Sequence, residues 1–113
     1  LEGSIDLPVA RKFIGGHCKA KKSHQFEINA ADYNLNGKDI SLYNLNQWKE
    51  LALAGLNNEG PLLTPMIWNA AVYFWITGIT NSINDGIHKA KDLISSKSVK
   101  NTLESLINWR QTL

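Results

Sequence analysis

Two histidines and four lysines in a short acid-free segment are the residues of this sequence best suited to chemistry. The segment runs from Arg11 to His24, includes His17, and contains no aspartate or glutamate. Imidazoles exchange protons near neutral pH, and an ammonium group can neutralise charge that develops on a phosphate in a transition state. We therefore predict that His17 and His24 act as a proton-transfer pair on RNA, with Lys21 or Lys22 stabilising the phosphate.

Positive charge is concentrated in this segment, although the whole chain is nearly neutral. The formal net charge is +2 at pH 7, from twelve lysines and arginines against ten acidic residues. Five of the twelve basic residues lie between residues 11 and 24, so the rest of the chain is slightly acidic. Because a local field of one sign attracts polyanions, we predict nucleic-acid contacts by Arg11, Lys12, Lys19 and Lys22.

These features predict a small nucleic-acid-directed protein, specifically a metal-independent ribonuclease of the bacterial toxin or effector type. Its partner would be nucleic acid, RNA rather than DNA, and it would need no cofactor and no metal. It would act in the cytoplasm, in the effector case after delivery from another cell. The alternative for the same segment is a solvated basic loop without catalytic function, because spacing along the chain does not show whether the two imidazoles meet.

The only cysteine, Cys18, offers two further kinds of site, and both are weaker hypotheses. Paired with His24 or His88 it could serve as a thiolate nucleophile, but the local signatures of cysteine proteases are absent. The donors His17, Cys18, His24 and His88 lack the paired spacing of structural zinc sites, so no metal site is predicted. A single cysteine in a small domain is more often an ordinary packing residue.

Length and composition predict one globular domain that covers residues 1–113. The chain is 43% hydrophobic and 19% charged, which is typical of a folded protein rather than a disordered one. One cysteine excludes an intramolecular disulfide bond. The N-terminus has no apolar run behind a basic start, so no signal peptide is expected, and residues 1–4 resemble a linker remnant.

The predicted fold class is mainly α, a helical bundle with a small β-ribbon or irregular element near residues 25–43. Residues 6–14 predict a short helix that ends at Gly15. In the ribbon, residues 25–28 would form one strand, a turn would follow at residues 34–37, and residues 40–43 would form the second strand. Residues 30–33 could instead form a helical turn.

The second half of the chain has clearer helical periodicity. Asn44 precedes apolar residues spaced three and four apart, which predicts a helix that ends before Asn57. A long helix is predicted from about residue 65 to 94, with a break near residues 84–86. Ser98 is expected to cap a last helix that runs to the end of the chain.

The most apolar stretch, residues 66–79, is too short for the roughly 20 residues of a membrane span, and it contains Asn69. We expect a helix buried in the core and no membrane partner. The alternative function for the whole chain follows from this stretch. It is a non-enzymatic helical protein-protein interaction module, whose protein partner docks on Trp68, Trp75 or another exposed part of the apolar helix.

Overall fold

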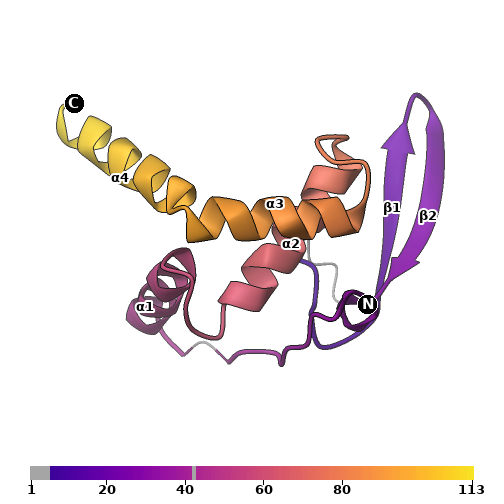
Figure 1. Cartoon of the computed structure of the whole chain (residues 1–113), viewed down its shortest axis with the longest axis horizontal. Coiled ribbons are helices and arrows are strands. Elements are labelled where there is room, and N and C mark those ends of the chain that lie inside the picture. The colour runs from indigo at the N-terminus through magenta and orange to yellow at the C-terminus, as the bar shows by residue number, and fades with distance from the viewer. Residues whose placement is uncertain (1–5, 42) are drawn as a thin grey trace.

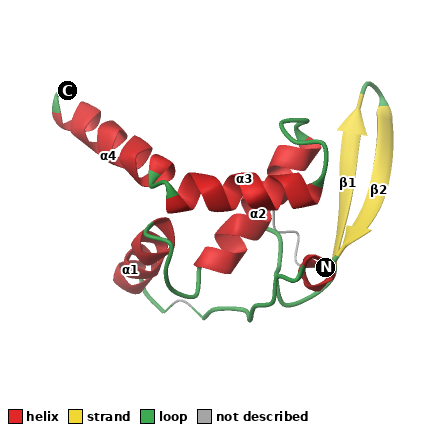
Figure 2. Ribbon diagram, viewed as in Figure 1, coloured by secondary structure: helices red, strands yellow, loops and turns green. Residues whose placement is uncertain are grey.

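The computed structural model describes residues 6–41 and 43–113, so the predicted linker remnant at residues 1–4 lies outside the described residues. Four helices and one two-stranded antiparallel ribbon form the fold (Figures 1 and 2), which confirms the predicted class of mainly α with a small β element. The elements are β1 (Phe13–Lys19), β2 (Lys22–Ile28), the short 3-10 helix η1 (Ala30–Tyr33), α1 (Leu45–Leu56), α2 (Leu63–Ile76), α3 (Ile83–Ser95) and α4 (Ser98–Gln111).

The ribbon lies earlier in the chain than predicted, and the helix expected at residues 6–14 is wrong, because residues 6–12 are irregular and β1 begins at Phe13. Its second strand includes the predicted residues 25–28, but the partner strand precedes them in the sequence. Gly15 does not end a helix. A Cβ atom at Gly15 would lie 2.5 Å from the Phe13 ring and 2.6 Å from the Phe26 ring, so glycine makes room for both aromatic rings.

The segment between the ribbon and α1 contains no second strand in its described residues. Residues 30–33 form the alternative helical turn, and Asn34 closes it with a left-handed backbone at φ 59°. Leu35 then enters the core. The predicted strand at residues 40–43 includes Leu42, which lies outside the described residues, and its other residues have no strand partner.

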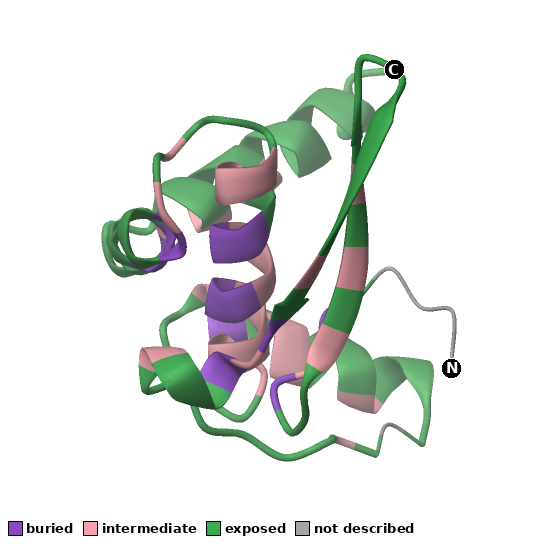
Figure 3. Ribbon diagram, turned by 90° about the vertical axis from the view of Figure 1, so that its right-hand side faces the viewer, coloured by how far each residue is buried: buried purple, intermediate pink, exposed green. Residues whose placement is uncertain are grey.

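Helices α2 and α3 form the centre of the molecule. Trp68 and Val72 of α2 are fully buried, and Ile87 of α3 packs in the same cluster. Gly86 of α3 lies so close to α2 that a Cβ atom there would be 2.5 Å from the carbonyl oxygen of Ala71. The prediction of a buried core helix is confirmed, and Figure 3 shows the buried residues gathered along this part of the molecule.

The single long helix predicted for residues 65–94 is in fact two helices, and the break lies before residues 84–86. Gly78 adopts a left-handed backbone at φ 76° after α2. Ser82 then caps α3, because its hydroxyl accepts a hydrogen bond from the Asp85 backbone N–H at 3.0 Å and donates one to the Asp85 carboxylate at 2.8 Å.

The peripheral helices α1 and α4 make few contacts with this centre. Asn44 caps α1 as predicted, with its side chain accepting from the Gln47 N–H at 2.8 Å. Lys97, in a left-handed conformation, precedes α4, so Ser98 is not its cap. No residue of α4 is buried. Figure 1 shows α4 extending away from the end of α3, while the ribbon projects from the opposite end of the molecule.

The polar residue Asn69 fits in the apolar helix α2 because its side chain is hydrogen-bonded. Its side-chain oxygen accepts from the backbone N–H of Leu7 at 2.8 Å, and its amide nitrogen donates to the Leu7 carbonyl at 3.0 Å. This clamp holds the N-terminal segment on the core. Among the described helices, none is both long enough and apolar enough to span a membrane.

Candidate functional site

The ribbon brings the two candidate catalytic histidines together. His17 in β1 lies directly opposite His24 in β2, and Lys19 lies opposite Lys22. Opposed residues in an antiparallel pair point to the same face, with Cβ atoms about 4.5 to 5.5 Å apart. Lys21 occupies the turn between the strands. Residues separated by seven positions in the sequence are therefore neighbours, which spacing alone did not show.

Aromatic packing fixes the base of this ribbon face on the helical core. The alternation of the strands places Phe13 and Phe26 on the same face as the histidines. The centroids of the two phenylalanine rings are 6.2 Å apart. Phe26 also meets Trp75 of α2 edge-on, with a centroid distance of 5.5 Å. The outer half of the ribbon, with the histidines and the tip, lies beyond this anchor.

The basic residues divide into two groups by their electrostatic partners. Arg11 pairs with Asp39, and Lys12 pairs with Glu27 at 2.9 Å. The other group comprises the exposed side chains of the ribbon tip, Lys19, Lys21 and Lys22, for which the described residues contain no ion pair. The tip lysines are consequently available to an anionic partner, whereas Arg11 and Lys12 are already partly neutralised.

Neither histidine is held in a defined orientation by the described part of the chain. His17 is half-buried and His24 is exposed, and no hydrogen bond between described residues orients either ring. General acid–base catalysis depends on imidazoles that are fixed in position, within a site that restricts water. The ribbon face has the charge and the register for binding an anion, but it is open on the outer side.

The remaining candidates from the sequence are not brought together. Cys18 lies opposite Ser23 and is exposed. Because successive residues of a strand alternate between faces, Cys18 and His24 lie on opposite faces of the ribbon. His88 is exposed on α3. A Cys18–His24 nucleophile pair is therefore wrong, and the described residues contain no group of three potential metal donors among His, Cys, Asp and Glu.

The two tryptophans named for docking on α2 are not exposed, and docking on the rest of α2, where Tyr73 is 42% exposed, stays a prediction. Trp68 is completely buried, and Trp75 is half-buried against Phe26. The exposed tryptophans are on α1 and α4, where Trp48 is 50% exposed and Trp109 is 59% exposed. The sequence does mark both helices as amphipathic, but it does not show which amphipathic helices lack a covering neighbour.

Sequence reasoning missed a cavity of about 480 Å³ beside the N-terminal segment. It lies between that segment, the loop around Lys38, α1 and the start of α2. Val9, Trp48 and Met66 contribute to its apolar lining, and the paired side chains of Arg11 and Asp39 also line it. Four segments that are distant in the sequence form this cavity, so no local signal could have identified it.

Comparison with known proteins identifies longer enzymes that resemble almost the whole chain. No family model matches. Anthranilate phosphoribosyltransferase of Burkholderia cenocepacia strain HI2424 is 22% identical over 114 residues, a match that covers 97% of this chain and 33% of that protein. The protein of the same name from Burkholderia orbicola strain MC0-3 matches equally, and that from Xanthomonas campestris pv. campestris strain B100 is 21% identical. The chain thus spans about a third of the length of the curated relatives it matches.

Proposed function

We propose that this chain forms part of a longer phosphoribosyltransferase-like enzyme, whose acceptor is an aromatic amine of the anthranilate type. The observation that carries this proposal is the extent of the match, which covers 97% of the chain and therefore includes the ribbon, the core helices and α4 together. A resemblance limited to one helix would reflect composition, whereas one of this extent favours a shared arrangement of elements.

Within such an enzyme, this part would support the fold, and the reacting groups would come from the rest of the polypeptide. The described residues contain no buried polar or charged residue. Transfer of a phosphorylated sugar requires preorganised polar groups in a site that excludes water. The polar residues described here are exposed or half-buried, so they favour a supporting role.

Genetic complementation tests this function. The polypeptide encoded by the complete reading frame that contains these residues is introduced into a bacterial strain that lacks its own anthranilate phosphoribosyltransferase. We expect that polypeptide to restore anthranilate consumption, and the 113-residue chain alone to fail. A longer polypeptide that is expressed and folded but restores nothing would contradict the proposal.

A second candidate function is polyanion binding by the ribbon tip, and a specific observation favours it. Lys19 and Lys22 are directly opposed, which destabilises a hairpin. The turn residues Ala20 and Lys21 have φ angles of 47° and 68°, a conformation normally taken by Asn-Gly. A ribbon selected for stability alone would avoid both features, so we propose that the tip lysines bind phosphate groups.

RNA cleavage by His17 and His24 stays a prediction beyond this binding function. If the pair is catalytic, His17→Ala and His24→Ala should each lower the cleavage rate by at least about a hundredfold, in the presence of a chelator and with the fold intact. The rate should also fall on both sides of a bell-shaped pH profile. Cleavage that survives the double substitution would rule out this mechanism.

A further inference from the structure

Helix α4 has an apolar face that the described part of the chain covers only in part, at the half-buried Leu103. We define the α4 face as Val99, Leu103, Leu106 and Ile107, which recur at the i, i+4, i+7 and i+8 positions of one helix side. Leu106 is 56% exposed and Ile107 is 44% exposed. Isolated helices of this length are marginal in water, and most helical stability in proteins comes from packing of such a face.

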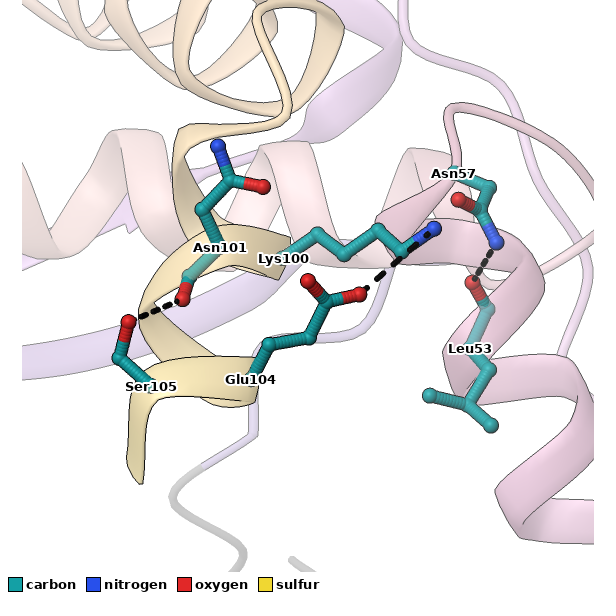
Figure 4. A network of polar contacts seen from close by, with 6 residues as sticks. All are labelled: Leu53, Asn57, Lys100, Asn101, Glu104 and Ser105. Carbon is teal, nitrogen blue, oxygen red and sulfur yellow. Dashed lines mark hydrogen bonds and ion pairs between the residues drawn. The ribbon is translucent and has the colours of Figure 1, made fainter. Parts of the chain in front are cut away.

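The start of α4 meets the rest of the molecule on one side, where Lys100 and Leu103 are half-buried, while the other residues of the helix are exposed. Figure 4 shows Lys100 and Glu104, an ion pair of 3.9 Å, on the side of α4 near Asn57 at the end of α1. Asn101 and Ser105 are joined on α4 by a hydrogen bond of 2.9 Å. Beyond Leu103 the α4 face is open, because Leu106 and Ile107 remain exposed among the described residues.

The shape of the molecule agrees with a missing covering element. Its radius of gyration is 15.5 Å and its longest extent is 44 Å. A compact chain of this length has a radius of gyration of about 13 Å. The projecting α4 and the projecting ribbon account for the difference (Figure 1).

We infer that the α4 face docks on the part of a longer phosphoribosyltransferase-like polypeptide that lies outside these 113 residues, an inference that rests on the proposed function. The relatives extend well beyond the match, which covers only 33% of their length but 97% of this chain. About two thirds of such a protein would therefore be available to cover the face. Arg110 lies on the same side of α4 beyond Leu106, so the covering surface would be apolar with a hydrogen-bond acceptor at one end.

Cysteine labelling tests this docking. In a Cys18→Ser background, Leu106→Cys places a thiol on the α4 face, and Asn108→Cys places a matched thiol on the opposite side of the same helix. Each variant is made in the 113-residue chain and in the polypeptide of the complete reading frame, and reaction with a polar maleimide is timed. We expect labelling at residue 106 to slow at least about a hundredfold in the longer polypeptide, and labelling at residue 108 to stay fast in both.

Equal labelling rates at residue 106 in the two polypeptides would overturn the inference. Slow labelling that appears in the 113-residue chain only at high concentration would also overturn it, because a second copy would then cover the face. The anthranilate assay on the same preparations separates the two proposals. If the longer polypeptide is active but residue 106 still reacts quickly, the proposed function holds and the docking is wrong. If residue 106 is protected but the polypeptide is inactive, the docking holds and the proposed function is wrong.

Discussion

The α2–α3 helix pair and the β1–β2 ribbon differ in how well their residue types suit a stable fold. In the helix pair, large side chains such as Trp68 are fully buried, and Gly86 permits a backbone approach that no larger residue allows. In the ribbon, opposed lysines and a turn without asparagine or glycine act against stability. The contrast indicates that packing explains the residues of the helix pair, whereas packing does not explain those of the ribbon tip, for which we propose phosphate binding.

Truncation of a core side chain should destabilise the protein most. Trp68→Ala should lower the free energy of unfolding by about 3 to 5 kcal/mol, because it loses transfer energy and leaves a cavity. Trp109→Ala is the matched control, since that ring is 59% exposed, and it should change the stability little. Urea denaturation of both variants measures the difference. Similar losses for the two would contradict the assignment of Trp68 to the core.

Alanine substitution of one glycine in each region tests how closely the backbone is packed there. Gly86→Ala should destabilise the fold by about 1 to 3 kcal/mol, because the added Cβ would meet the Ala71 carbonyl and outweigh the helix propensity that alanine gains. Gly16→Ala in the ribbon meets nothing within 4 Å and should be nearly neutral. Thermal unfolding compares them, and a neutral Gly86→Ala would argue against the close helix crossing.

Charge removal tests the role of the ribbon tip. Replacing Lys19, Lys21 and Lys22 by glutamine should weaken RNA binding and reduce its salt dependence by about one unit of log–log slope for each phosphate that is no longer neutralised. The control replaces an equal number of exposed lysines elsewhere: Lys49, Lys91 and Lys97. Fluorescence anisotropy at several salt concentrations measures both. An equal decrease in the control would mean that net charge, not the ribbon, determines binding.

Substitutions in the ribbon turn should have a smaller effect. Replacing Ala20 by asparagine and Lys21 by glycine should stabilise the ribbon by about 0.5 to 1 kcal/mol, because these residues accept positive φ angles. Ala20→Val should act in the opposite direction, since a β-branched residue is strained there. Hydrogen exchange of the β1 and β2 amides reports the change. If both variants exchange at the same rate, the turn is not under strain.

Local signals predict the fold class and several helix limits. The cap at Asn44 and the apolar stripe of α3 depend on neighbouring residues, so they can be read from the sequence. The ribbon could not be placed, because Gly15 resembles a helix end and serves instead to accommodate two aromatic rings. Gly86 likewise suggests a helix break in the sequence, but glycine is needed there for the close approach to Ala71 on another helix.

The candidate site could be predicted in its residues but not in its geometry. The basic segment indicates His17 and His24, yet their direct opposition depends on a turn at Ala20 and Lys21, which has no sequence signal for a hairpin. The partners of Arg11 and Lys12 come from other segments. Pairings of this kind depend on the folded chain rather than on composition.

A single assay distinguishes the two proposed activities, phosphoribosyl transfer and RNA cleavage. The purified polypeptide of the complete reading frame is mixed with anthranilate, a 5-phosphoribosyl donor and labelled RNA, and both anthranilate fluorescence and RNA length are followed. We expect anthranilate fluorescence to fall only when the donor is present, while the RNA is bound without being shortened. Unchanged anthranilate together with chelator-resistant shortening of the RNA would contradict the proposed function and favour the ribonuclease.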